Sequence, residues 1–164
     1  MLEVKLGSIT HTDADALVVY LMEGGPGNHP VNATNAVDVL LGGVLRRAVA
    51  AGTLAGRRGE VWTAQSQILV IVVGLGAAET FDEHVAAEAV ALSLKKAIGL
   101  EARQVATVTL GTGRGGLNVK ASAAAVAKGV RRAGGAVAVE LLVYDAEDLE
   151  AARAGVASAV GSEG

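Results

Sequence analysis

The chain has 164 residues and a formal net charge of −3, with 51% hydrophobic residues, only 2% aromatic residues and no cysteine. This length is typical of one domain with a substantial core, here built from Ala, Val and Leu side chains packed at close quarters. The composition excludes disulfides, thiolate nucleophiles and zinc–thiolate sites, and it argues against a nucleic-acid partner because both basic and stacking side chains are scarce.

The N-terminal segment has no basic region followed by a long apolar run. No apolar stretch approaches the roughly 18 to 20 residues that a membrane span needs. We therefore expect a cytoplasmic chain with no membrane partner. The pattern predicts one domain over residues 1–160 and a frayed tail over 161–164.

Runs of β-branched residues alternate with Ala-rich runs along the chain. The former predict strands and the latter predict helices. The expected strands are residues 2–9, 14–21, 59–65, 66–76, 105–111 and 138–145. The expected helices are residues 36–52, about 81–100, 119–134 and 146–160. Repeated alternation of this kind predicts an α/β fold with buried strands.

Several residues are typical of helix ends. Thr34 or Asn35 is expected to cap the helix that starts at Ala36, and the pair Thr80 and Glu83 forms a capping-box pattern for the next helix. Gly42-Gly43 lies inside the first predicted helix, at a cost of about 1 kcal/mol for each glycine relative to alanine. We attribute this pair to close packing rather than to ligand contact.

Two strands end in glycines directly before a helix: VGLG, which contains Gly74, Leu75 and Gly76, and LGTGRGGLN, residues 110–118. In an open α/β sheet, ligands bind at the carboxyl ends of strands, and glycine allows backbone amides to approach a phosphate. Both loops are therefore candidates for one anion cradle. Glycine is also favoured where helices pack on sheets, so close packing is the alternative interpretation of each loop. The second loop contributes Gly111, Thr112, Gly113, Arg114, Gly115, Gly116 and Leu117.

Neither loop is a Walker motif, because no Gly-Lys-Ser or Gly-Lys-Thr follows, and GTGRGG is a poor dinucleotide fingerprint. The guanidinium of Arg114 either covers a pyrophosphate bidentately or points to solvent. The three histidines lie far apart in the sequence, with no spacing typical of metal ligands. We therefore predict no metal site, no cofactor and no catalytic residue.

The order of these segments resembles the macro domain, and most of all the macro-like N-terminal domain of the leucyl aminopeptidase family. The segments that carry the resemblance are GSITHTDADALVV, NAVDVLLGGVLRRAV, LVIVVGLG and TLGTGRGGLNVKASAAAVAKGV, and together they extend over about residues 2–160. The resemblance implies a three-layer α/β/α sandwich with a mixed, mostly parallel sheet. The peptidase domain that follows in the aminopeptidases has no counterpart here, so peptidase activity is not expected.

The resemblance also assigns positions. Ser8-Ile9 stands where macro domains carry the Asp-Ile that holds adenine, and Val37-Asp38 matches the start of the helix that faces the phosphates. The loop from Gly111 to Leu117 matches the phosphate loop. Hydrolytic macro domains carry an Asn-Ala-Ala-Asn run where this chain has Val19-Tyr20-Leu21-Met22, so the hydrolytic asparagine is missing.

The leading hypothesis is a binding module for ADP-ribose or another phosphate-bearing nucleotide. The phosphates would lie on the amides from Gly113 to Leu117, with the helix start at Asn35, Ala36 and Val37 and the corner from Gly74 to Gly76 completing the cleft. One alternative is an oligomerisation or scaffold module derived from an aminopeptidase domain. A further alternative is an ADP-ribosyl hydrolase, against which Met22 argues.

Overall fold

The computed structural model describes residues 1–24, 33–113 and 115–161. The strands are β1 (Leu2–Leu6), β2 (Ala16–Glu23), β3 (Val61–Gln65), β4 (Leu69–Ala77), β5 (Gln104–Val108) and β6 (Ala138–Val143). The helices are α1 (Ala33–Leu40), α2 (Val44–Ala51), α3 (Glu83–Gly99), α4 (Val119–Ala133) and α5 (Ala146–Gly161), with a short 3₁₀ turn η2 (Ala78–Thr80). Of the tail expected to fray, residues 162–164 lie outside the described residues, whereas Gly161 is the last residue of α5.

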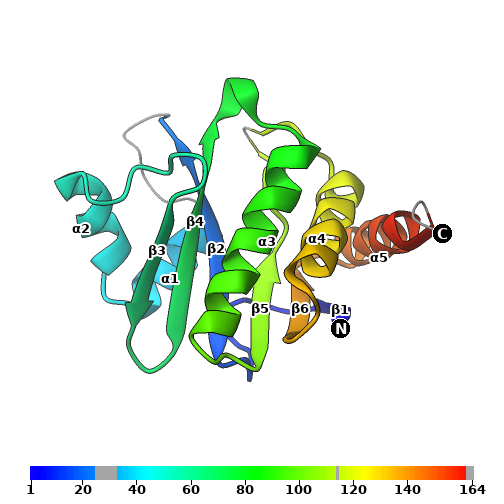
Figure 1. Ribbon diagram of the computed structural model, residues 1–164, viewed down its shortest axis with the longest axis horizontal. Helices are drawn as coiled ribbons and strands as arrows, with labels where there is room; N and C mark the ends of the chain where they lie inside the picture. Colours follow the sequence, from blue (N-terminus) through cyan, green and yellow to red (C-terminus); the bar gives the residue numbers. More distant parts are fainter. Residues whose placement is uncertain (25–32, 114, 162–164) are drawn as a thin grey trace.

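The six strands form one sheet in the order β1-β6-β5-β2-β4-β3 (Figure 1). Every neighbouring pair is parallel except β3 and β4, which are antiparallel. Strand β4, which lies between β2 and the edge strand β3, is buried along nearly its whole length, as expected for a strand covered on both faces. The predicted mixed, mostly parallel sheet is confirmed.

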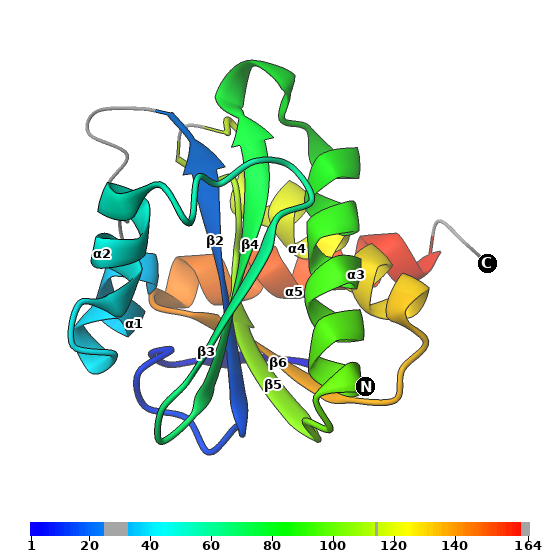
Figure 2. The same cartoon turned by 60° about the vertical axis from the view of Figure 1, so that its left-hand side comes forward.

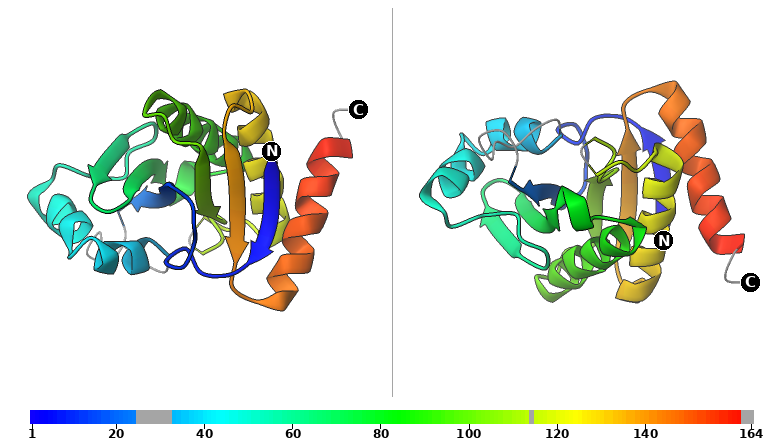
Figure 3. Two further views of the ribbon diagram at one scale, coloured as in Figure 1. Left: turned by 90° about the horizontal axis from the view of Figure 1, so that it is seen from below. Right: turned by 90° about the horizontal axis from the view of Figure 1, so that it is seen from above.

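Helices cover both faces of the sheet, so the fold has three layers (Figures 2 and 3). Helices α3, α4 and α5 bury one face, and α1 and α2 bury the other over β2 and β4. On the second face, Ile9 and Ala14 of the connection between β1 and β2 join the same core cluster as α1 and α2. The predicted α/β/α sandwich is therefore confirmed, and its core consists largely of Ala, Val and Leu.

The helix predicted at 36–52 is in fact two helices, because Gly42 and Gly43 both have positive φ, of 69° and 84°. An added Cβ at Gly42 would meet no atom of the described residues within 4 Å, and one at Gly43 would meet only the end of the flexible Arg47 side chain, at 3.2 Å from Nη1. Close packing among the described residues is therefore not the reason for this pair. A left-handed backbone is the reason, since glycine adopts it at little cost. The side chain of buried Asp38 then starts α2 by accepting hydrogen bonds from the amides of Leu45 and Arg46, at 2.8 Å and 3.3 Å.

Two further helix starts differ from the prediction. Helix α3 is capped by Asp82, whose Oδ1 accepts from the amide of Val85 at 2.9 Å, and not by a Thr80 capping box. Thr80 lies in η2 and donates to the carbonyl of Ala77. Helix α1 begins at Ala33, so Thr34 is not its cap. Instead, the Thr34 hydroxyl donates to the carbonyl of Tyr20 at 2.8 Å and attaches α1 to β2.

Candidate functional site

The carboxyl ends of the parallel strands meet at one edge of the sheet. Strand β5 lies beside β2, and the two strands lead to helices on opposite faces, because α1 covers the second face and α4 the first. Such a switch between neighbouring strands is where open α/β sheets bind ligands. The Gly-rich loop, residues 111–117, follows β5 at this switch point.

The base of the Gly-rich loop is fixed by side chains of α4. The Ser122 hydroxyl donates to the carbonyl of Leu110 and accepts from its amide, both at 2.8 Å. The Asn118 side chain caps α4 by accepting from the amide of Ala121 at 2.7 Å. Loop and helix start are therefore held in one arrangement.

Three of the four glycines in this loop have a structural cause. Gly111 has a φ of 70° and lies directly on the ring of Phe81, and Gly116 has a φ of 76°. A Cβ at Gly115 would lie 2.7 Å from each of three atoms: the Gly111 carbonyl oxygen, Met22 Cε and Phe81 Cδ2. Glycine at these positions is explained by turn geometry and by packing on Phe81 and Met22.

Gly113 is the exception. An added Cβ there would meet no atom of the described residues within 4 Å, and its φ lies outside the left-handed region. Neither backbone conformation nor packing within the described part of the chain therefore requires glycine. Gly113 and its neighbour Thr112 are exposed. A glycine that the described residues do not explain is what close approach of a ligand to the backbone would require.

Some amides of the loop are already paired. The amide of Leu117 donates to the Gly111 carbonyl at 2.9 Å, and that of Gly116 donates to the Gly113 carbonyl at 3.2 Å. Within the described part of the chain, the amides of Thr112, Gly113 and Gly115 donate to no other residue. Arg114 lies outside the described residues. The open donors thus surround Gly113.

The corner at the end of β4 is arranged differently. The amide of Gly74 donates to the Glu60 carbonyl at 2.8 Å, and that of Gly76 donates to the Gly56 carbonyl at 2.9 Å. The backbone of Arg57 lies directly against Gly74, and Leu75 is buried. Both glycine amides are therefore engaged within the chain, and the segment 56–60 takes the place that a ligand would need.

Segment 56–60 is fixed by hydrogen bonds across its own turn and by one to α3. The Glu60 carboxylate accepts from the amides of Ala55 and Gly56, the latter at 2.6 Å from Oε1. Arg58 Nε donates to Glu88 Oε2 of α3 at 2.7 Å, and this hydrogen bond lowers the pKa of Glu88 against the opposing effect of burial. The contact of this segment with β4 is therefore part of the fold.

Ser8 and Ile9 follow β1 at the same edge of the sheet. The Ser8 hydroxyl is hydrogen-bonded to that of Thr10 at 2.9 Å, and Ile9 is buried in the core. Further along, Thr12 donates to Glu140 at 2.8 Å. Burial would raise the pKa of Glu140, but hydrogen bonds from Thr12, Lys5 and Gln104 outweigh it, so the pKa lies below its ordinary value.

Asn35, Ala36 and Val37 lie inside the first turns of α1 rather than at its cap. Asn35 is exposed, and its Oδ1 accepts from Nη2 of Arg46 at 3.5 Å. The side chain of Val37 is fully buried. Of these three residues, Asn35 therefore offers the most accessible polar side chain.

Tyr144 is a candidate that the sequence analysis missed. It directly follows β6, whose last residue Val143 pairs with Leu6, and Gly7 donates to the Val143 carbonyl. Tyr144 is 82% exposed and Leu6, on the neighbouring strand, is 54% exposed. An aromatic residue directly after an apolar strand is the sequence signal that could have identified Tyr144 as a candidate contact residue.

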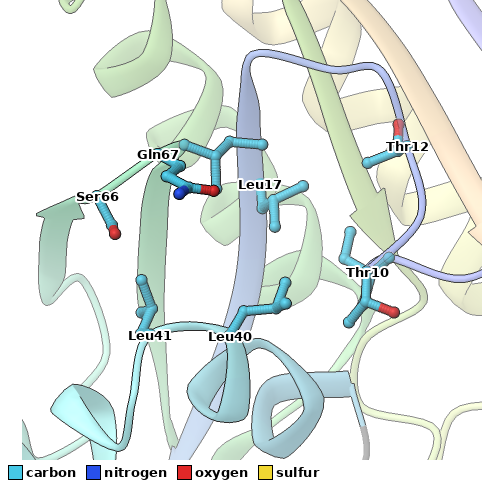
Figure 4. A pocket seen from close by; sticks show the side chains of 9 residues that line it. Thr10, Thr12, Leu17, Leu40, Leu41, Ser66 and Gln67 are labelled. Atoms are coloured by element: carbon cyan, nitrogen blue, oxygen red, sulfur yellow. The ribbon is translucent and has the colours of Figure 1, made fainter.

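A cavity of about 320 Å³ lies at the opposite edge of the sheet (Figure 4). It opens beside the start of β2, the end of α1 and the turn between β3 and β4. Of the predicted site residues, only Ile9 lines it; the other lining residues are Thr10, Thr12, Leu17, Leu40, Leu41, Ser66, Gln67 and Ile68. The predicted site and this cavity therefore share only Ile9.

The described residues contain no group of three metal-binding side chains that could hold an ion. No helix in the same part of the chain is long and apolar enough to cross a membrane.

The three layers, the mostly parallel sheet and the loops at its carboxyl edge define a macro-domain fold. Residues 18–134 match the cytosol aminopeptidase family, N-terminal domain, and the chain belongs to this family. No curated protein matches the sequence.

Solved structures show the same fold at low identity. A mutant of tomato leucine aminopeptidase is similar with a TM-score of 0.72 and 16% identity, over 98% of this chain and 36% of that chain. The Oceanobacillus iheyensis macrodomain with ADP has a TM-score of 0.73 and 15% identity, over 98% and 92%. The Trypanosoma brucei macrodomain in complex with ADP has a TM-score of 0.70 and 16% identity, over 94% and 67%. This chain thus spans about a third of the tomato enzyme.

Proposed function

We propose that the chain binds a phosphate-bearing nucleotide, of the type of ADP or ADP-ribose, at the carboxyl edge of the sheet. The observation that carries the proposal is Gly113, where neither the backbone φ nor any contact with the described residues requires glycine. The phosphates lie on the amides of Thr112, Gly113 and Gly115, which donate to no other described residue. Backbone amides hold a phosphate without requiring a positive net charge.

The position of the loop supports this proposal. It lies at the switch point between β5 and β2, where ligands bind in open α/β sheets. Two macrodomains with the same fold were crystallised with ADP. In this proposal the base stacks on Tyr144, the exposed aromatic side chain that follows β6 beside β1, and Ser8 follows β1 near it, because Gly7 is bonded to Val143.

Binding, rather than hydrolysis, is the function that we propose. Met22 stands where hydrolytic macro domains carry asparagine. Its methyl carbon Cε packs against Gly115, where an added Cβ would lie only 2.7 Å from it. A thioether offers neither a strong donor nor a strong acceptor to position water. The ligand is therefore expected to leave the protein unchanged.

Calorimetric titration with ADP-ribose, ADP and adenosine tests the proposal. We expect ADP-ribose and ADP to bind and adenosine to bind at least tenfold more weakly, because it lacks the phosphates. Gly113→Ala should weaken ADP binding at least tenfold, since the added methyl group occupies the space at the open amides.

Gly99→Ala is the matched control, because Gly99 also has an ordinary φ and open space around its Cα but lies at the end of α3. It should bind ADP as the wild type does. Folded wild-type protein that gives no heat at millimolar ADP or ADP-ribose, or a Gly113→Ala variant with unchanged affinity, would overturn the proposal.

A further inference from the structure

Strand β3 forms an outer edge of the sheet with unpaired backbone groups. The amide of Gly74 donates to the Glu60 carbonyl and that of Ser66 donates to the Ile68 carbonyl, which fixes the ladder between β3 and β4. Because hydrogen-bonded residues alternate in an antiparallel pair, the outward amides and carbonyls belong to the intervening residues. These are Val61, Thr63 and Gln65, which bond to no described residue other than those of the β3–β4 hairpin.

The two edges of the sheet differ in charge. Strand β3 and the turn after it, residues 61–68, contain no charged side chain. Strand β1 at the other edge carries Glu3 and Lys5, and Lys5 pairs with Glu140 at 3.1 Å. Charged residues on an edge strand prevent edge-to-edge pairing, so β1 has this protection and β3 does not.

We propose that β3 pairs with β3 of a second copy of this chain, antiparallel and centred on Thr63. In this register Thr63 faces Thr63 of the second copy, and Val61 faces Gln65. The outward residues are spaced evenly about Thr63, so donors of one copy meet acceptors of the other, as a two-fold interface requires. With no charge on the edge, two identical strands do not repel each other.

An exposed apolar surface near β3 fits the same arrangement. Val39 and Leu40 of α1 are 67% and 52% exposed, and Leu40 lines the cavity beside the turn from Ser66 to Ile68 (Figure 4). Figure 2 shows the edge of β3 with α1 and α2 to one side, and in Figure 1 α2 extends beyond β3. A two-fold axis perpendicular to the sheet brings α2 of the second copy to the face that α1 and α2 cover.

The proposed dimer is independent of nucleotide binding, because it involves the side of the sheet formed by β3 and not the carboxyl ends of the strands.

A five-residue strand pair with one helix contact buries less than the roughly 1,600 Å² of a standard interface, so a weak dimer is expected. Sedimentation from about 10 μM to about 1 mM protein, the range for weak association, should show a reversible monomer–dimer equilibrium.

Variants at Thr63, an exposed residue, test the register. Thr63→Pro removes an outward amide, which an edge strand tolerates, and should weaken dimerisation at least tenfold. Thr63→Val, the matched control, keeps the amide and the β-branched shape and should dimerise as the wild type does. Circular dichroism and ADP affinity report whether each variant is folded.

Two charged variants at Thr63 test the same register without the backbone change that proline introduces. Thr63→Lys and Thr63→Glu should each be monomeric, because like charges would face each other across the two-fold axis. Mixing the two variants should restore a dimer. Wild-type protein that stays monomeric at about 1 mM, a Thr63→Pro variant that dimerises normally, or a mixture that stays monomeric would overturn the proposal.

Discussion

The two glycine corners at the carboxyl edge look alike in sequence and differ in structure. At the end of β4, the amides of Gly74 and Gly76 donate to the carbonyls of Glu60 and Gly56. In the loop after β5, Gly113 has open space around it, and nearby amides have no partner among the described residues. The first corner is filled by segment 56–60, whereas no described residue fills the second. Glycines at strand ends therefore indicate that another group comes close to the backbone, but they do not show whether that group belongs to the chain or to a ligand.

The largest expected effect is that of Gly74→Ala. The new Cβ would overlap the Arg57 carbonyl and lie 2.6 Å from the carbonyl carbon of Gly56, both backbone atoms that cannot rotate away. We expect a loss of about 3 kcal/mol in the free energy of unfolding, measured by chemical denaturation. A variant as stable as the wild type would show that segment 56–60 does not fill this corner.

An intermediate effect is expected for Ser122→Ala at the base of the open corner. The change leaves the amide and carbonyl of Leu110 without their partner, at a cost of about 1–3 kcal/mol in unfolding free energy. ADP binding should weaken as well, since the loop loses its fixed base. If the melting temperature and the ADP affinity both stay unchanged, the hydrogen bonds between Ser122 and Leu110 do not hold the loop.

The smallest effect on stability is expected for Gly113→Ala. Because the position has space and an ordinary φ, the free energy of unfolding should change by less than about 1 kcal/mol. The same change should abolish most ADP binding, which separates this glycine from Gly74. A large loss of stability, measured by the same denaturation experiment, would place Gly113 with the structural glycines.

The alternation of apolar and Ala-rich runs predicted an α/β fold with buried strands, because such runs determine which segments are buried. The three layers and the mostly parallel sheet were predicted from the resemblance to macro domains. The prediction from sequence failed where one local pattern is compatible with two structures. Gly42-Gly43 is compatible with packing or with a left-handed turn, and only the backbone of the folded chain distinguishes them. Thr80 and Asp82 are both capping residues, and the 3₁₀ turn before α3 decides in favour of Asp82.

The candidate site shows the same division. The loop after β5 was located by its position between a strand and a helix. That Gly74 and Gly76 are already paired depends on segment 56–60, which lies about 15 residues earlier and reaches β4 only through tertiary packing. The exposure of Tyr144 likewise depends on where β6 ends beside β1.

The proposed nucleotide site is tested most directly by an NMR titration of backbone amides with ADP. We expect the signals of Thr112, Gly113 and Gly115 to shift progressively with ADP, whereas those of Gly74 and Gly76 stay in place because their amides are bonded within the chain. Shifts confined to Gly74 and Gly76, or no shift at either corner at millimolar ADP, would contradict it.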